Sequence, residues 1–212
     1  ARYNLPPAPR PDGTYPVPDA ENPFGDPAFP FANPPYSARA YSYVAVAQYE
    51  ALKAAWYYKY QYNRPAPSRV DAAITTVVPA SDLPSYPSED AVLSGVTAEM
   101  LKSLFPASVE EITRRAAEER EAAILSGKAT ASDIAAGLAL GKAVATAVLA
   151  RAANDGTRNA AGTTALWQGM AAAVAAKGEI PWESQESPKR PPMLPNFGRV
   201  VAWTLTPAQQ EA

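Results

Sequence analysis

The placement of proline constrains this chain more than any other feature of its sequence. Eleven of the 23 prolines fall within residues 1–35, and a second proline-rich stretch begins at Pro181. Because proline fixes φ and lacks a backbone N–H, neither stretch can form a helix interior or a central strand. The first also carries five aromatic residues, which a freely disordered linker seldom does. We therefore predict an extended arm over 1–35 that packs on its own chain or a partner, and a Pro-rich arm over 179–212.

Between the arms the sequence predicts helices. Residues 37–63 are rich in Ala and lack Gly and Pro, with Ser37 as the expected N-cap and "NRPAP" as the stop. Its small residues form one helical face suited to close packing, namely Val44, Ala47, Ala51, Ala54 and Ala55. A proline- and serine-rich loop is expected over 66–87.

Caps and stops predict the remaining helices. The next helix starts near Ser88 and stops before Pro106. Another opens with a Ser108 and Glu111 capping box and ends on Gly127. A third is capped by Ser132 and Asp133, with an Ala- and Gly-rich face for close packing, and a weaker helix follows within 160–176. No alternating strand pattern is found, so the predicted fold is an all-α helical bundle over 36–178.

Composition excludes several classes of function. With 19 basic and 21 acidic residues the chain has no basic stripe for nucleic acid. It contains no cysteine and no histidine, which removes thiolate metal sites, the usual metal ligand and the usual general base near neutral pH. Residues 136–150 are the longest apolar run and are too short to span a bilayer. The start at Ala1 suits a removed leader, so we expect a secreted or periplasmic protein.

Three stretches could meet at one end of such a bundle. They are "NRPAP" after the first helix, "YPSED" at the start of the second and "SGKATASD" before the later helix. They would bring together Arg64, the amides near Ser88 and the Asp133 cap. Arginine and helix N-termini are the groups that bind oxyanions. Two interpretations of Arg64 stay open: an anion contact, or a helix-terminal arginine paired with a carboxylate.

In their order along the chain and in their residues, these stretches resemble the vanadium-dependent haloperoxidases and the type 2 phosphatidic acid phosphatase superfamily. The likeness covers roughly residues 36–205 and is greatest to the degenerate N-terminal half of large bacterial members. That family carries Lys followed by Arg-Pro, then Pro-Ser-Gly-His, then an arginine, a Gly-x-His and an Asp. The matching stretches are "NRPAP", "SYPSEDAVLSGVTAEMLKSLFP", "SDIAAGLALGKAVA" and "PPMLPNFGRVVAWTL".

The resemblance implies a remnant oxyanion pocket whose chemical groups are missing. The retained positions are Arg64, Pro65, Ser88, Gly127 and Asp133. The degenerate positions are Tyr57 for the lysine, Asp90 for the acid-base histidine, Ala123 for the arginine and Ala129 for the histidine that binds vanadate or attacks phosphate. Lys59 lies five residues before Arg64, whereas the family has its lysine seven residues before.

These losses predict a pseudoenzyme. Alanine at position 129 has no lone pair to offer vanadium or phosphorus, and Asp90 adds negative charge to a site meant for an anion. We expect no intact catalytic residues, no metal and no vanadate cofactor. The expected role is a structural or assembly subunit that contacts other protein chains through its arms. Candidates for those chains include a second copy of this chain and a histidine-bearing homologous half. The alternative is half of a haloperoxidase or phosphatase whose site is completed by a second chain or domain.

Other assignments are weaker. The helix "YEALKAAWYYKYQY" could bind aromatic ligands or sugars, but aromatics at helical spacing more often belong to core and interface. Glu118 with Glu119, or Glu110 with Glu111, could suggest a glycosidase pair. Their basic neighbours on the same helix favour a solvated charged face instead. A small-anion binding module using Arg64 and helix amides is a third possibility.

Overall fold

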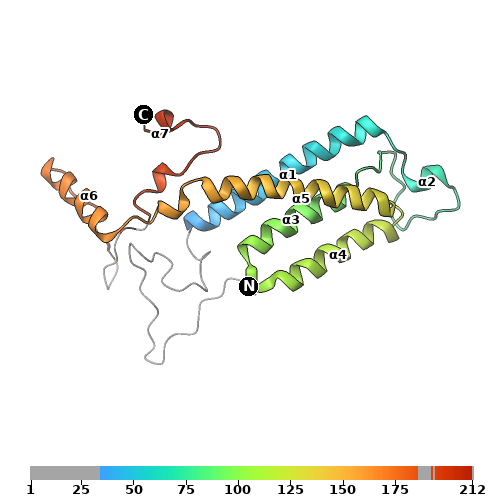
Figure 1. The fold of residues 1–212 in the computed structure, drawn as a ribbon, viewed down its shortest axis with the longest axis horizontal. Coiled ribbons are helices and arrows are strands. Elements are labelled where there is room, and N and C mark those ends of the chain that lie inside the picture. The colour runs from blue at the N-terminus through green and yellow to red at the C-terminus, as the bar shows by residue number, and fades with distance from the viewer. Residues whose placement is uncertain (1–33, 186–191, 193, 212) are drawn as a thin grey trace, which may run out of the picture. The chain divides into compact units, whose positions relative to one another are not determined.

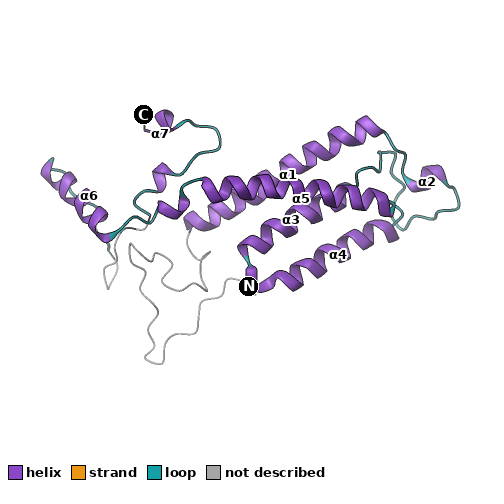
Figure 2. Ribbon diagram, in the orientation of Figure 1, coloured by secondary structure: helices purple, strands orange, loops and turns teal. Residues whose placement is uncertain are grey.

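The computed structural model describes residues 34–185, 192 and 194–211, and it is helical without strands in that part of the chain (Figures 1 and 2). The helices are α1 (Pro34–Tyr62), α2 (Pro67–Val70), α3 (Glu89–Leu104), α4 (Val109–Leu125), α5 (Ala131–Asn154), α6 (Thr164–Ala176) and α7 (Pro207–Glu211). Short 3-10 turns occupy Pro106–Ser108, Thr157–Asn159 and Phe197–Arg199. The predicted all-α class is confirmed. The predicted N-terminal arm lies outside the described residues except at its last two positions. Residues 186–191, 193 and 212 of the predicted C-terminal arm also lie outside them.

The chain divides into two compact units. One comprises residues 38–152, and the other comprises 1–37 together with 153–212. The first contains most of α1, all of α2, α3 and α4, and α5 up to residue 152. This division joins the two ends of the chain in one unit, whereas composition suggested two separate arms and a bundle between them. The boundaries of those three segments stay a prediction.

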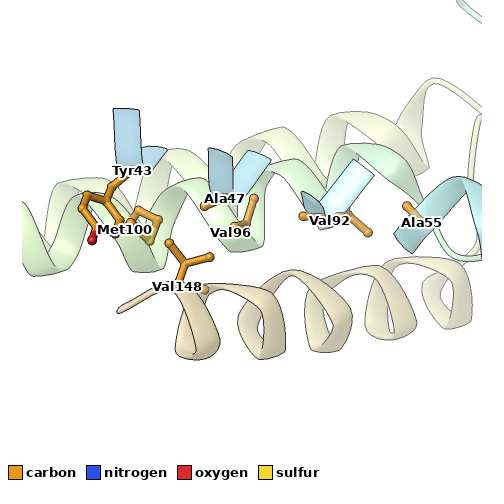
Figure 3. Close-up of a cluster of buried hydrophobic side chains, with 9 residues drawn as sticks. Tyr43, Ala47, Ala55, Val92, Val96, Met100 and Val148 are labelled. Carbon is orange, nitrogen blue, oxygen red and sulfur yellow. The ribbon is translucent and has the colours of Figure 1, made fainter. Parts of the chain in front are cut away.

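The 38–152 unit is a bundle in which α1, α3, α4 and α5 lie side by side (Figure 1). Its core is built from small and medium side chains of α1, α3 and α5 (Figure 3). The buried members are Tyr43, Ala47, Ala51, Ala55, Val92, Val96, Met100, Ala145 and Val148. The predicted small-residue face of α1 is therefore the face that packs.

Helices α3 and α5 approach each other closely because glycine lines their contact. A Cβ atom on Gly137 would lie 2.3 Å from the Ser88 carbonyl oxygen, and one on Gly141 would lie 2.4 Å from that of Val92. Real Cβ atoms essentially never come that close to another heavy atom. The predicted close packing of this Ala- and Gly-rich face is confirmed.

Several helix boundaries differ from expectation. Helix α1 begins at Pro34, so Ser37 lies inside it and is not its N-cap. Ser108 forms no capping hydrogen bond, because its φ of −116° and ψ of 15° belong to the preceding 3-10 turn and not to the extended geometry of an N-cap. The short helix α2 interrupts the loop predicted over 66–87.

Other helix ends agree with the sequence. The Ser88 hydroxyl caps α3 by accepting the Ala91 N–H at 3.3 Å. Helix α4 ends in a Schellman motif, in which Lys128 N–H bonds the Ala123 carbonyl and Gly127 has a φ of 75°.

The unit formed with residues 153–212 contains α6, the 3-10 turn Phe197–Arg199 and α7. Its C-terminal segment is hydrogen-bonded to residues just beyond α5: Asn196 N–H bonds the Ala160 carbonyl at 3.0 Å, and Val201 N–H bonds that of Asp155 at 2.9 Å. Leu194 is buried in this unit. Part of the Pro-rich C-terminal arm thus packs on its own chain.

Candidate functional site

Arg64 and Asp133 form the centre of the candidate site. Asn63 adopts a φ of 44° and Pro65 cannot extend a helix, so α1 stops and Arg64 turns toward the start of α5. Its Nη1 atom donates to Asp133 Oδ1 at 2.7 Å and to Ser132 Oγ at 2.8 Å. The Asp133 side chain is 0% exposed and that of Arg64 is 44% exposed. Arg64 thus makes the carboxylate pairing that was one of its two interpretations.

Asp133 also ties together the starts of two helices. Its Oδ2 accepts the Thr130 N–H at 2.8 Å, while Thr130 Oγ1 accepts the Asp133 N–H at 3.4 Å. The Asp133 carbonyl accepts the Ser88 N–H at 3.0 Å. Thr130, and not Ser132, therefore shares the reciprocal cap with Asp133, since the Ser132 hydroxyl is directed to Arg64.

Lys59 is the buried cation of the site. It is 4% exposed, and its Nζ donates to the Pro84 carbonyl at 2.5 Å and lies 3.9 Å from Glu89 Oε2. Burial lowers the pKa of Lys59 below its usual value of 10.5, and the nearby carboxylates of Glu89, Asp90 and Asp133 partly oppose this shift. Tyr57, which the resemblance placed at the lysine position, is an exposed residue of α1.

Asp90 faces a cation supplied by the loop before α5. Lys128 Nζ lies 3.1 Å from Asp90 Oδ2, and both side chains are partly exposed. Each of the three cations named so far thus has a carboxylate of the same chain beside it. The pairs are Lys59 with Glu89, Arg64 with Asp133, and Lys128 with Asp90.

The positions of the missing arginine and histidine are apolar. Ala123 and Ala129 are buried and share a small cluster with Ala91 and Ile134. This cluster joins the end of α4, the loop before α5 and the first turns of α3 and α5. Small apolar packing thus occupies the space beside the Lys128–Asp90 pair, where the family resemblance implies charged side chains.

Pro65 and Gly127, two further positions that the resemblance retains, act through the backbone. The Pro65 carbonyl accepts the Ser85 hydroxyl at 3.3 Å, and the Arg64 carbonyl accepts the Ser85 N–H at 2.9 Å. These bonds connect the end of α1 to the segment before α3. Gly127 ends α4 and lies against Thr76, so its role here is conformational.

Glu118, one of the carboxylates suggested as a glycosidase pair, lies in an exposed ion pair of α4. Glu118 pairs with Arg114 at 2.5 Å, and both side chains are half exposed. Among the described residues, no group of three or more acidic side chains is placed to hold a metal ion.

A second feature of the 38–152 unit is a pocket that sequence reasoning missed. It has a volume of about 240 Å³, and we call it the tyrosine pocket. Its lining comprises Tyr58, Tyr62, Tyr86, Pro87, Ala136 and Leu140. Tyrosines four residues apart at the end of α1, followed by a Tyr-Pro before α3, were the available signal.

Helix α5 is long and apolar enough to cross a membrane. By length and composition alone, the helical run Ala131–Asn159 could do so, with a mean hydropathy of 1.6 over its 18 most apolar consecutive residues. Only 28% of that window is buried, although α5 contributes Gly137, Gly141 and Ala145 to the bundle interior. This is weak support for a span, and the prediction of no span stays a prediction.

Comparison with known proteins adds no relative. Neither a scan against protein-family models nor a search of curated proteins finds a match to this chain. The site must therefore be interpreted from its own geometry.

Proposed function

We propose that this chain is a non-catalytic, haloperoxidase- and acid-phosphatase-like helical protein that serves as a structural or assembly subunit of a larger complex. The observation that carries the proposal is the Arg64–Asp133 pair. The cation expected to receive an oxyanion is already bound to a buried carboxylate of the same chain.

The surrounding charges support the same role. An incoming phosphate or vanadate would meet three carboxylates, those of Glu89, Asp90 and Asp133, and would have to displace them from their cations. Breaking a pair that includes a buried carboxylate strands an unpaired charge, which is strongly unfavourable. Buried alanines at 123 and 129 provide neither the missing cation nor a nucleophile.

Calorimetry tests the lack of an anion site. Orthovanadate and inorganic phosphate, titrated separately to millimolar concentration into the full chain, are expected to give no heat of binding. A histidine-bearing member of the haloperoxidase family serves as the positive control. Saturable heat that disappears in an Arg64→Ala variant would overturn the proposal in favour of a small-anion binding module.

The alternative is half of an enzyme completed by a second chain, and it rests on the family resemblance alone. Native mass spectrometry with peptide sequencing, on the protein isolated from its source, separates the two functions. The proposal expects a homo-oligomer or a complex whose partner lacks a Pro-Ser-Gly-His sequence. A copurifying chain with that sequence, together with bromide oxidation or phosphate ester hydrolysis by the complex, would establish the alternative.

A further inference from the structure

We propose that the outer face of α1 is the contact surface between two copies of this chain, which pair antiparallel about a two-fold axis. We call this surface the aromatic face, and its residues are Ala45, Tyr49, Leu52, Lys53, Trp56 and Tyr60. It lies within the 38–152 unit and contains none of the residues of the candidate anion site. The inference rests on the proposed assembly role and deepens it by assigning a partner.

The aromatic face lies opposite the buried face of α1. Ala47, Ala51 and Ala55 pack into the core against α3 and α5 (Figure 3). At 3.6 residues per turn, a position two residues away along a helix points about 200° round it. Tyr49 and Lys53 are placed in this way relative to the three alanines, and Lys53 Nζ lies 5.3 Å from the centroid of the Tyr49 ring. The core of this unit therefore leaves the aromatic face uncovered.

The aromatic side chains of this face are large and accessible to solvent. Tyr49 is 62% exposed and Tyr60 is 65% exposed. The Trp56 ring is partly exposed, and its centroid lies 5.7 Å from that of Tyr60. Aromatic residues at helical spacing belong mostly to cores and interfaces, and Tyr and Trp are enriched in interfaces. Because these side chains lie outside the core, an interface is the role that remains for them.

The charges at this face complement a second copy of themselves. Glu50 and Lys53 are the only charged residues between Arg39 and Lys59, and Lys59 is buried. They lie 3.0 Å apart, and both side chains are half exposed. A two-fold axis at this place sets Glu50 of each copy beside Lys53 of the other. A partner with a strong net charge would gain little from a face whose two charges cancel.

The side chains of the face also complement one another in size. In an antiparallel pair whose axis crosses the middle of residues 45–60, Tyr60 faces Ala45 of the other copy and Tyr49 faces Trp56. A bulky ring is thus set against a small residue at each end, and two aromatic pairs lie between them. This stretch is about 24 Å long, or more than four helical turns. A two-fold pair uses the same surface on both copies, which closes the assembly at a dimer.

Sedimentation equilibrium of the full chain at micromolar concentrations tests the proposal. We expect a reversible equilibrium between monomer and dimer. Tyr49→Ala and Tyr60→Ala should each weaken the dimer about tenfold, because each removes an aromatic ring from the contact. Tyr62→Ala is the matched control, since Tyr62 is as exposed as Tyr49 on the same helix but lines the tyrosine pocket. Circular dichroism checks that all three variants keep the fold.

Two charge variants test the two-fold arrangement. Glu50→Lys gives each copy two positive side chains at this place, and Lys53→Glu gives each copy two negative ones. Either variant alone should therefore dimerise about tenfold more weakly than the unmodified chain. An equimolar mixture should recover the lost affinity, because every contact between the two copies then joins opposite charges. Glu118→Lys breaks a similarly exposed ion pair on α4 and should leave the dimer unchanged.

Three outcomes would overturn the inference. A chain that stays monomeric throughout would show that the aromatic face does not hold a second copy. An equal loss of affinity with Tyr62→Ala and Tyr49→Ala would place the contact elsewhere. A mixture of the charge variants that dimerises no better than either one alone would exclude the two-fold pairing. The proposed function fails on a different result, saturable binding of phosphate or vanadate, so the two failures are distinguishable.

Discussion

Asp133 shows how a single side chain can set the character of a site. It is fully buried, and its partners come from the end of α1, the loop before α5 and, through its carbonyl, the start of α3. Its principal charge partner, Arg64, is half exposed. If Arg64 is removed, the buried Asp133 carboxylate loses its charge partner and cannot reach water. If Asp133 is removed, water can still solvate the Arg64 guanidinium.

We predict that removal of the exposed member is the more damaging change. Arg64→Ala should lower the free energy of unfolding by about 2–4 kcal/mol, because it strands a buried carboxylate. Adding Asp133→Ala to that variant should restore part of the loss. Denaturant unfolding of both single variants and the double variant measures this coupling.

Glu118→Ala is the control for the Arg64 prediction. It breaks an exposed ion pair on α4 and should change stability by only about 0.5 kcal/mol. An Arg64→Ala loss no larger than that of the control would mean that the Arg64–Asp133 pair contributes little.

Lys59 gives a prediction of pH dependence. Because burial lowers its folded pKa below 10.5, the unfolded state binds more protons between the folded value and 10.5. The penalty for burying the charge is therefore complete below the folded pKa and fades as the pH rises toward 10.5. The stability of the unmodified chain relative to Lys59→Met should increase with pH over this interval.

Urea unfolding of the two proteins between about pH 8 and 11 measures this difference. Taking the difference removes the titration of groups that both proteins share. A flat difference would mean that the fold stabilises the ammonium group as well as water does, and a falling difference would mean that the fold stabilises it better.

At this scale the sequence predicted part of the site. The meeting of Arg64, Ser88 and Asp133 was expected from helix ends and caps, and the structure brings them together. Lys59 was passed over because motif spacing pointed to position 57. Yet Lys59 continues the four-residue series of Ala51 and Ala55, so helical periodicity already placed it on the buried face.

Among the elements, the contact of α3 with α5 depends on the absence of side chains. Gly137 and Gly141 sit one turn apart and face backbone oxygens of α3. An added methyl group at either position must push the two helices apart, because a backbone oxygen cannot rotate away as a side chain can.

We predict that Gly137→Ala and Gly141→Ala each lower the free energy of unfolding by about 2 kcal/mol or more. Gly95→Ala should cost less, since its nearest new contact is the flexible end of Leu138 at 3.1 Å and its nearest backbone oxygen, that of Leu138, lies at 3.3 Å and not at 2.3–2.4 Å. Chemical denaturation of the three variants gives the order. Equal effects at all three positions would contradict the close-contact explanation.

Gly169 in α6 provides the opposite case. An alanine there would meet no atom within 4 Å, so Gly169→Ala should stabilise α6 by up to about 1 kcal/mol through helix propensity alone. Hydrogen exchange of the α6 amides measures the change. Slower exchange is expected, and faster exchange would indicate a contact at Gly169 that the glycine serves.

The sequence predicted the helices well, and it predicted their C-terminal ends better than their N-terminal caps. Proline stops and glycine caps act through local backbone geometry, which is why the ends at Tyr62, Leu104 and Leu125 agree with the sequence. Serines at 37, 108 and 132 were expected to cap, yet none does. A serine's hydroxyl caps only when tertiary packing leaves its backbone extended, and composition does not report that.

On the scale of the whole molecule, the two units differ in how much they bury. Helices α3 and α5 each bury several side chains, whereas α6 buries none. We predict that α6 amides exchange much faster with deuterium than those of α3 when the purified chain is studied by mass spectrometry. Protection of α6 equal to that of α3 would indicate that another surface covers it.

The fold class could be predicted because it follows from short-range rules that proline, glycine and alanine obey. The division into two units could not, since it depends on which distant segments exchange hydrogen bonds, as 194–201 does with 155–160. The tyrosine pocket was missed for a related reason. Its wall combines α1, the segment before α3 and α5, and only three-dimensional packing brings them together.

The three ion pairs at this end of the bundle also determine the electrostatic field at a distance from it. They are Lys59 with Glu89, Arg64 with Asp133, and Lys128 with Asp90. Opposite charges a few ångströms apart leave only dipolar and higher multipolar fields, which decay faster with distance than the field of a lone charge. Ions in solution screen what remains within about 10 Å. An anion diffusing past would feel almost no pull from a place where six charged side chains gather.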